Sequence, residues 1–452
     1  MNPHIFRQYD IRGDASADLG DDFAEDLGRA IGSFQIRAGN RRLVLGRDCR
    51  LSSPRLHTAL LKGLRTTGVD LVDIGVVPTP MMYFTVFYEA LDGGVMITGS
   101  HNPPKDNGFK MMREHRSLYG EDIQELLRIM EARDFVQGPE GEYEELDPVP
   151  NYINHMRRDI AIPKNAIRFA IDAGNGAGGP TAVKTMTALG LEPVALLCEM
   201  DGRFPVHHPD PTQPKNLQLL KDTVLEQNLD VGIAFDGDAD RIGVIDQQGN
   251  VIWGDRLMVL LSRSVLKKHP GAAILGEVKC SQTMYDEIAR HGGRPILWKT
   301  GHSLIKAKMK EEGALLAGEM SGHIFFADRY FGFDDAVYAA LRLIEILAEE
   351  GKPLHELLSD VPVTYNTPEI RVPCPDDEKF DVVARVLAHY QATHEVVDVD
   401  GARVLFEGGW GLVRASNTQP VLVLRFEADT DARLTAIREE VEAVVSSARA
   451  AS

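Results

Sequence analysis

The chain has 452 residues, of which 44% are hydrophobic and 26% are charged, and acidic side chains outnumber basic ones by 67 to 49. This composition is typical of a globular protein, and the length exceeds what one hydrophobic core supports, so we expect several domains. The formal charge of −18 argues against a protein that neutralises nucleic-acid phosphates.

No apolar run approaches the roughly 18 residues that span a bilayer, and residues 1–7 lack the apolar stretch of a signal peptide. We therefore expect a cytoplasmic protein without a membrane partner. The four cysteines are widely spaced and form no CxxC pair, which argues against a zinc site or a disulfide framework. They are Cys49, Cys198, Cys280 and Cys374.

Short apolar runs alternate with amphipathic stretches three times along the chain, a pattern typical of α/β domains with largely parallel strands. Each round is predicted to run strand, helix, strand, helix, strand and to end in a polar loop. We predict strands at 42–46, 70–74 and 94–97, then at 167–171, 193–197 and 231–235, and then at 272–276, 294–298 and 314–317. We predict helices at 54–67, 82–89, 179–189, 216–227, 282–290 and 302–311.

The last part of the chain differs in kind and reads as a smaller α+β domain. We predict a helix at 378–392, strands at 395–406, 410–414 and 421–427, and a helix at 431–448. Stretches rich in proline, glycine or glutamate at 138–150 and 359–377 are typical of linkers. The fold class is therefore α/β, with three similar domains built on mixed, largely parallel sheets and a C-terminal α+β domain. The predicted domains are 1–145, 146–250, 251–362 and 363–452.

The first polar loop places Ser100 directly after the apolar run 95–97. The predicted loop continues to Lys110 and carries a serine, a histidine and two lysines between glycine and proline residues. In open α/β sheets, ligands bind outside the carboxyl ends of the strands. A polar turn without chemistry is the alternative, and the other loops weigh against it.

The second polar loop alternates Asp236, Asp238 and Asp240, so three carboxylates can converge on one hard cation such as Mg²⁺. An EF-hand is excluded because Arg241 stands at its glycine position and Gln247 at its glutamate position. A solvated acidic turn is one alternative. A phosphatase that uses Asp236 as its nucleophile is another.

Two further loops carry groups that suit a phosphorylated sugar. Glu319 and Ser321 can hydrogen-bond to sugar hydroxyls, and His323 can move a proton near neutral pH. In the C-terminal segment, residues 414–418 (RASNT) combine a guanidinium with hydroxyls and turn amides, which suits a phosphate.

Gly174, Gly176 and Gly179 match a dinucleotide-binding fingerprint after a predicted strand, and Glu199 follows about 20 residues later. The same glycines also suit a tight strand-to-helix turn, which we favour because the other loops indicate phosphate chemistry without a nicotinamide. A non-catalytic protein that binds a dinucleotide or a sugar phosphate stays an alternative.

Seven motifs occur in an order that resembles the α-D-phosphohexomutase family, in its phosphomannomutase/phosphoglucomutase branch, and the resemblance covers the whole chain. They are FRQYDIRG (6–13), TGSHNPPKDNGFK (98–110), FPVHHPDPTQPKNL (204–217), DGDADR (236–241), TGHSLIK (300–306), GEMSGH (318–323) and RASNT (414–418). The loop GEMSGH resembles enzymes that accept both glucose and mannose phosphates, whereas phosphoglucosamine mutases tend to differ around the serine and the acidic loop.

The resemblance implies an intramolecular phosphotransferase that interconverts hexose 1-phosphates and hexose 6-phosphates through a hexose 1,6-bisphosphate. Ser100 would carry the phosphoryl group, and Asp236, Asp238 and Asp240 with the phosphoserine would hold Mg²⁺. Glucose 1,6-bisphosphate or mannose 1,6-bisphosphate would act as activator. Lys110 and His323 would be the general base and acid, with His101 and Arg241 beside the phosphoryl group.

The resemblance also implies substrate contacts and a moving C-terminal domain. Residues that would bind the sugar or its second phosphate are Glu319, Met320, Ser321, Arg414, Ser416, Asn417 and Thr418, and residues that would line a central cleft are Tyr9, Arg12, Lys279 and His302. We expect a hinge near Val361 to Asn366 and a monomer acting on free hexose phosphates. The preference between glucose and mannose stays open because one epimeric hydroxyl is worth only about 1 to 3 kcal/mol.

Overall fold

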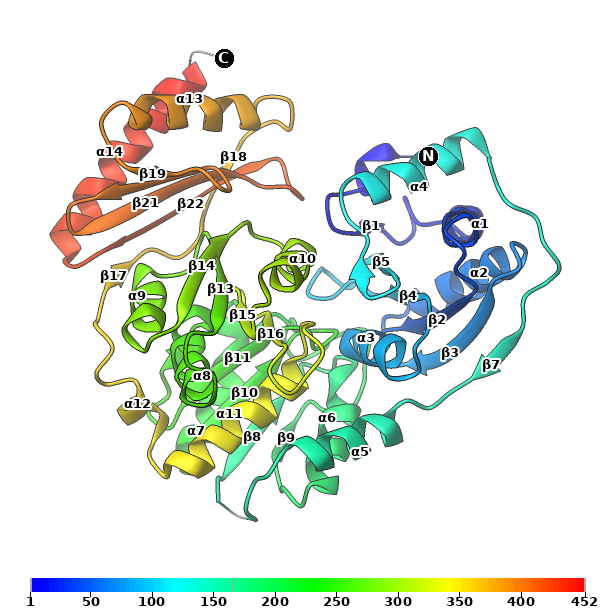
Figure 1. Cartoon of the computed structure of the whole chain (residues 1–452), viewed down its shortest axis with the longest axis horizontal. Helices are drawn as coiled ribbons and strands as arrows, with labels where there is room; N and C mark the ends of the chain where they lie inside the picture. Colours follow the sequence, from blue (N-terminus) through cyan, green and yellow to red (C-terminus); the bar gives the residue numbers. More distant parts are fainter. Residues whose placement is uncertain (1, 165, 451–452) are drawn as a thin grey trace.

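The computed structural model describes residues 2–164 and 166–450. In Figure 1 the N-terminal part of the chain lies at the right in blue and cyan, the middle parts lie below in green and yellow, and the C-terminal part lies at the upper left in orange and red. Each part contains a sheet with helices packed beside it. The predicted α/β class with a C-terminal α+β part is confirmed, while the domain boundaries at residues 145, 250 and 362 stay predictions.

The first part has a mixed sheet with the strand order β1-β5-β4-β2-β3-β7. The central strands are parallel, and β5 runs antiparallel to β4. Its strands are β1 (Ile11–Asp14), β2 (Arg42–Arg47), β3 (Asp70–Val76), β4 (Gly93–Ile97), β5 (Asp106–Arg113), β6 (Arg116–Ser117) and β7 (Tyr143–Glu145). Its helices are η1 (Pro3–Ile5), α1 (Asp21–Arg37), α2 (Ser53–Arg65), α3 (Thr79–Tyr88) and α4 (Glu121–Ala132).

The second sheet has the order β12-β11-β10-β8-β9, and the third has the order β14-β13-β15-β16. The strands of the second part are β8 (Phe169–Asp172), β9 (Val194–Leu196), β10 (Val231–Phe235), β11 (Ile242–Asp246) and β12 (Val251–Ile252), and its helices are α5 (Val149–Asp159), α6 (Gly178–Ala188), η2 (Pro214–Leu217) and α7 (Gln218–Glu226). The strands of the third part are β13 (Ala273–Glu277), β14 (Arg294–Trp298), β15 (Leu316–Gly318) and β16 (Ile324–Phe326), and its helices are α8 (Gly254–Lys268), α9 (Gln282–Arg290), α10 (His302–Glu312), α11 (Ala336–Glu350) and α12 (Leu354–Leu357).

The C-terminal sheet is antiparallel, with the order β17-β22-β21-β20-β19 and with β18 also paired to β22. Its strands are β17 (Tyr365–Asn366), β18 (Ile370–Pro373), β19 (Val396–Val397), β20 (Ala402–Phe406), β21 (Gly409–Ala415) and β22 (Val421–Ala428), and its helices are α13 (Lys379–Gln391) and α14 (Asp431–Ala450). Both helices contact β21, so they cover one face of this sheet.

The polar loops of the three α/β parts are hairpin connections. Strands β4, β10 and β15 are each followed by an antiparallel partner, β5, β11 and β16 respectively. The predicted single loop from residue 98 to Lys110 is therefore wrong, because Lys110 lies within β5 opposite Met96. Strand β5 buries the polar Asn107 and Lys110 as well as Phe109, so it lacks the alternation of apolar and polar residues that reveals a strand.

The predicted linkers are shorter than the sequence suggested. The stretch 138–150 contains β7, which pairs with β3, and the stretch 359–377 contains β17 and β18. Glycine and proline in these stretches flank short edge strands as well as connections, which explains the error.

A continuous apolar cluster holds the first three parts together, with Met96, Phe235 and Ile274 from three different sheets among its members. Helix α11 is buried around most of its circumference within this cluster. The C-terminal part has an apolar core of its own and meets the third part through Trp410 and Val278. Among the described residues, no helix combines the length and the apolar character that crossing a membrane would need.

Candidate active site

Ser100 follows β4 in a strained conformation and faces the second α/β part. Its φ of 47° lies in the left-handed region, which is uncommon for a residue with a side chain. The side chain is buried, with Oγ donating to Asp236 Oδ2 at 2.7 Å and lying 3.0 Å from Nδ1 of His101. The predicted nucleophile is thus held beside the predicted acidic loop.

A guanidinium that sequence reasoning missed holds the serine loop in place. Arg50 Nη2 donates to the carbonyls of Ser100 at 2.8 Å and Asn102 at 2.6 Å. Its Nη1 donates to the carbonyls of Pro103 at 2.6 Å and Asp106 at 2.9 Å. The side chain is fully buried beside Asp48, so the loop is fixed from behind. Arg50 lies just after the carboxyl end of β2, and this position could have indicated a role in the site, because ligands bind outside the carboxyl ends of strands in such sheets.

The acidic loop between β10 and β11 places three buried carboxylates close together. One oxygen from each of Asp236, Asp238 and Asp240 lies within 4.8 Å of the others. Lys110 Nζ donates to Asp238 Oδ2 at 2.8 Å and to Asp240 Oδ2, and Thr79 Oγ1 donates to Asp238 Oδ2 at 2.5 Å. The loop is therefore tied to the first part through β5 and the start of α3.

The carboxylate cluster fits a metal ion. Oδ1 of Asp238 and Oδ1 of Asp240 are buried and accept no hydrogen bond from any described residue. This is energetically costly unless a cation or a water molecule binds to these oxygens. Burial and the neighbouring charges of Asp238 and Asp240 raise the pKa of Asp236 well above its ordinary value. The atoms of this cluster that could bind a metal ion are all carboxylate oxygens, which hard divalent cations prefer as ligands.

The environment of Lys110 is dominated by two carboxylates. Burial acts to lower the pKa of this lysine, but the charges of Asp238 and Asp240 outweigh burial and raise the pKa above its ordinary value. With these contacts Lys110 supplies positive charge to the acidic loop, and its role as general base stays a prediction.

Arg241 and His323 meet across two hairpins. An isolated β-bridge pairs their backbones, and Arg241 Nε donates to His323 Nε2 at 2.9 Å. His323 Nδ1 lies 3.0 Å from Asp334 Oδ2, a carboxylate that sequence reasoning missed. The rings of His323 and His302 stack with centroids 5.6 Å apart, so His302 also reaches this cluster.

His101 and Arg12 complete the surroundings of the serine. Burial, with the neighbouring charges of Arg241 and Arg12, lowers the pKa of His101 well below its ordinary value, so its ring is neutral at pH 7. Arg12 Nε donates to Asp10 Oδ2 at 2.7 Å, and its Nη1 donates to Asn102 Oδ1 at 3.1 Å. Arg12 thereby contacts the serine loop from the N-terminal motif.

The loop between β15 and β16 forms a second, adjacent group. Glu319 Oε1 accepts from the backbone of Gly301 at 2.7 Å, and its Oε2 accepts from Ser321 Oγ at 3.1 Å. Lys279 Nζ lies 3.2 Å from Glu369 and 3.8 Å from Glu277. Glu277 and Glu369 were also missed, since nothing in their local sequence indicates contact with a predicted site residue.

The remaining predicted residues lie on or against the C-terminal part. Arg414 Nε donates to Asp400 Oδ2 at 3.0 Å, and the backbone of Met320 donates to Glu277 at 3.4 Å. Ser416 Oγ accepts from the backbone of Thr418 at 3.3 Å, which shapes the RASNT turn.

Tyr9 links three of the four parts. Its hydroxyl donates to the carbonyl of Thr300 at 2.7 Å and accepts from Asn417 Nδ2 at 2.7 Å. The N-terminal motif therefore contacts the third and the C-terminal parts at once.

The glycines of the possible dinucleotide fingerprint have packing reasons. A Cβ at Gly179 would lie 2.3 Å from the carbonyl oxygen of Cys198, and one at Gly176 would lie 2.6 Å from that of Gly237. Gly237 in turn approaches the carbonyl oxygen of Ser100. These glycines allow the second part to pack closely around the acidic loop, as a tight strand-to-helix turn requires.

Four family models match the chain in order. They describe the α/β/α domains I, II and III of phosphoglucomutase/phosphomannomutase, at residues 3–137, 150–249 and 253–365, and the C-terminal domain, at residues 369–444. A phosphomannomutase/phosphoglucomutase of Pseudomonas aeruginosa is 46% identical over 448 residues, which cover 98% of this chain and 96% of that protein. A phosphoglucomutase of Neisseria meningitidis serogroup A is 46% identical over 447 residues, which cover 98% of this chain and 97% of that protein.

A solved structure gives the same result. The crystal structure of a phosphoglucomutase/phosphomannomutase family protein from Burkholderia thailandensis superposes with a TM-score of 0.94 at 42% identity, covering 99% of this chain and 98% of that one.

The fold, the carboxylate cluster and the matches to known proteins define the chain as an enzyme of the phosphohexomutase class. Such an enzyme is an isomerase that interconverts hexose 1-phosphates and hexose 6-phosphates. Within this class it belongs to the phosphoglucomutase/phosphomannomutase family. The family resemblance and the activity predicted from the sequence are confirmed.

Proposed function

We propose that Ser100 carries the phosphoryl group of this mutase and that the bound hexose passes through a 1,6-bisphosphate. The observation that carries the proposal is the buried hydrogen bond of 2.7 Å from Ser100 Oγ to Asp236 Oδ2, at the centre of the carboxylate cluster. The sugar hydroxyl attacks phosphorus, the P–Oγ bond breaks with its electron pair on Oγ, and a proton returns to Oγ. The bisphosphate then turns round and gives its other phosphoryl group back to the serine.

The cation of the site is proposed to be Mg²⁺, held by Asp236, Asp238, Asp240 and the phosphoserine. When bound, Mg²⁺ neutralises negative charge that develops on the transferring phosphoryl group. Lys110 adds a positive charge beside two of these carboxylates, and Arg241 and His101 are proposed to lie beside the phosphoryl group. His323, the other residue predicted for acid–base work, would accept the proton of the attacking hydroxyl and return it in the reverse direction.

The residues proposed to contact the substrate are those of the predicted sugar and phosphate loops. Glu319, Met320 and Ser321 would bind the sugar ring, and the RASNT turn with Arg414, Ser416, Asn417 and Thr418 would bind the phosphate that is not reacting. Tyr9, Arg12, Lys279 and His302 are proposed to line the central cleft between the parts. Both glucose and mannose phosphates are proposed substrates, with glucose 1,6-bisphosphate or mannose 1,6-bisphosphate as activator.

Assembly and location are part of the proposal. The candidate site is assembled from four parts of a single chain, which supports a monomer. The net charge of −18 supports small phosphorylated sugars rather than nucleic acid as partners. We propose that the enzyme acts in the cytoplasm without a membrane partner.

The phosphatase alternative has less support. Asp236 Oδ1 accepts from the backbone of Asp240 at 3.1 Å and of Arg241 at 3.2 Å, and its Oδ2 accepts from Ser100. A carboxylate that is buried and engaged on both oxygens is poorly placed to attack phosphorus itself.

The test is a coupled mutase assay of the wild type and Ser100→Ala with Mg²⁺, glucose 1-phosphate or mannose 1-phosphate, and a trace of the 1,6-bisphosphate. We expect the variant to fold and to lose at least about 10³-fold in kcat, and only the wild type to gain one phosphate in its intact mass. Ser117→Ala, which changes another buried serine outside the loop, serves as the matched control. Near-normal turnover of Ser100→Ala would place the nucleophile elsewhere, and release of inorganic phosphate would favour the phosphatase.

A further inference from the structure

The two ring nitrogens of His323 have different nearest partners. Nε2 lies 2.9 Å from Arg241 Nε and 4.0 Å from Glu319 Oε2, whereas Nδ1 lies 3.0 Å from Asp334 Oδ2 and 3.7 Å from Asp240 Oδ1. The Nε–H of an arginine can only donate, so Nε2 must be the accepting nitrogen of a neutral ring. The ring proton therefore resides on Nδ1, which lies close to two carboxylates and forms no hydrogen bond with any described residue in this geometry.

We propose that Asp334 is a positioning residue that holds His323 in this tautomer, with the Nε2 lone pair directed toward the reacting groups. The inference rests on the proposed function, in which His323 moves the proton of the attacking sugar hydroxyl. In this structure Arg241 Nε donates to Nε2. The half-buried side chain of Arg241 can turn and donate to a phosphate instead, which frees Nε2.

The backbone fixes the Asp334 carboxylate against the ring. Asp334 follows β16 and precedes α11, and an isolated β-bridge pairs it with Phe325. A second bridge pairs His323 with Arg241, so both residues of the dyad are anchored by main-chain contacts. Asp334 is completely buried, which leaves its carboxylate little freedom to seek another partner.

Two cationic or ionisable groups face Asp334 from α10. Lys306 Nζ donates to Asp334 Oδ1 at 3.0 Å, and His302 Nδ1 lies 3.8 Å from Oδ2. Lys306 is itself enclosed, with Nζ 4.0 Å from the centroid of the Tyr83 ring. The lysine neutralises the carboxylate on one oxygen and leaves the other oxygen for His323, as an orienting carboxylate requires.

The arrangement assists proton transfer in both directions. When Nε2 accepts the hydroxyl proton, the ring becomes an imidazolium whose Nδ1 lies 3.0 Å from the carboxylate of Asp334. The positive charge is thereby stabilised without moving a second proton, and the ring returns the Nε2 proton when the reaction reverses.

Asp334→Asn tests the inference with little change in volume. An amide lacks the negative charge, and its NH₂ group can face Nδ1 and select the opposite tautomer. We expect kcat to fall by about 10² to 10⁴-fold, with KM changed less than about threefold, and Asp334→Glu to restore part of kcat. A kcat of Asp334→Asn within about threefold of the wild type would overturn the inference.

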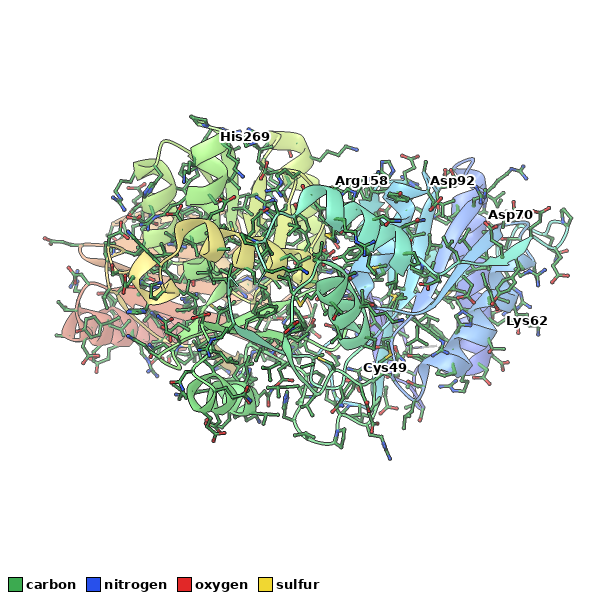
Figure 2. All side chains as sticks on the ribbon, turned by 90° about the horizontal axis from the view of Figure 1, so that it is seen from below. Cys49, Lys62, Asp70, Asp92, Arg158 and His269 are labelled. Carbon is green, nitrogen blue, oxygen red and sulfur yellow. The ribbon has the colours of Figure 1, made fainter. Side chains whose placement is uncertain are left out.

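Asp328→Asn is the matched control because Asp328 is a buried carboxylate just before the same segment that also pairs with a histidine. Its Oδ1 lies 3.1 Å from His269 Nε2, and its Oδ2 accepts from Arg342 Nη2 at 2.7 Å. His269 lies at the outer edge of the molecule in Figure 2. We expect this variant to lower the melting temperature and to leave kcat within about twofold, which separates lost stability from lost positioning.

A measurement on the wild-type enzyme keeps the test decisive if Asp334→Asn fails to fold. The ¹⁵N shifts of histidine ring nitrogens distinguish a protonated from an unprotonated nitrogen, and His323→Gln identifies the signals of His323. We expect a protonated Nδ1 and an unprotonated Nε2, and the reverse pattern would overturn the inference. This readout does not depend on turnover, so a failure of the Ser100→Ala prediction would reject the proposed function without altering it.

Discussion

Ser100 Oγ lies 2.7 Å from Asp236 Oδ2, although 136 residues separate them in the sequence. The contact joins the hairpin that follows β4 to the hairpin that follows β10. Gly237 makes the approach possible, because a Cβ at this position would lie 2.3 Å from the carbonyl oxygen of Ser100. The nucleophile and the carboxylate cluster are therefore one structural unit.

This unit leads to a prediction on metal binding. Asp238→Asn removes one charge from the cluster while keeping a group that can still accept from Thr79. We expect the Mg²⁺ concentration for half-maximal activity to rise at least about tenfold, because the cluster loses an anionic ligand. Activity titrated against Mg²⁺ measures the shift.

The control for this experiment is Asp222→Asn, which changes a carboxylate on α7 that accepts from Gln218. An unchanged Mg²⁺ dependence in Asp238→Asn would contradict the assignment of the cluster as the metal site.

The fold could be predicted from the sequence where a short apolar run has clear ends or a helix has one apolar face. Strand β10 coincides with the predicted 231–235, and helix α9 coincides with the predicted 282–290. Helix α11 was not predicted, because a helix that is apolar on most sides has no amphipathic period. Helices α1 and α8 were also not predicted, although their periodic apolar residues offered a usable signal.

In the candidate site, too, some residues could be found from local sequence and others could not. The motif loops with Ser100, Asp236 and His323 could be found because polar groups follow strand ends. The position of Arg50 after a strand end was a usable signal, but the roles of Arg50 and Asp334 depend on which backbone carbonyl or ring nitrogen the folded chain brings to them. The carboxylate partners of Lys110 could not be predicted for the same reason, because they lie 128 and 130 residues away.

Arg50 is predicted to control the geometry of the serine loop. Arg50→Lys keeps the charge but replaces a planar fork with a single ammonium that cannot reach four carbonyls at once. We expect kcat to fall by about 10²-fold, the cost of a displacement of about 1 Å in a reacting group. Arg55→Lys on α2 is the matched control, and steady-state kinetics with circular dichroism separates lost geometry from lost folding. A kcat equal to that of the wild type would show that the loop holds its shape without the fork.

Asp335 gives a prediction on pH. It caps α11 and accepts from Tyr152 at 3.0 Å and Tyr330 at 2.7 Å, yet burial raises its pKa from 3.8 to about 6. A carboxyl group with a raised pKa stabilises the fold in its protonated form, fully below its unfolded value, and this contribution is lost as the pH rises through the folded value. The shift corresponds to about 3 kcal/mol.

Asp335→Asn stays neutral and can still cap the helix. Between pH 4 and pH 7 we therefore expect the wild type to lose up to about 3 kcal/mol of unfolding free energy relative to the variant. Denaturant unfolding at several pH values measures this difference, with the exposed Asp381→Asn as control. A difference that is constant over this range would mean that the carboxyl group of Asp335 titrates near its ordinary value.

Tyr9 is predicted to hold the C-terminal part against the rest of the site. Tyr9→Phe keeps the ring that packs on Gly301 and removes both hydrogen bonds of the hydroxyl, to Thr300 and from Asn417. Each bond contributes about 0.5 to 1.5 kcal/mol, so we expect kcat/KM to fall by up to about tenfold while the melting temperature changes little. Small-angle scattering should show a more extended average shape if the hinge near Val361 to Asn366 opens more often. The exposed Tyr88→Phe is the control. Unchanged kcat/KM of Tyr9→Phe with an unchanged scattering profile would show that the hydroxyl of Tyr9 does not stabilise the closed arrangement.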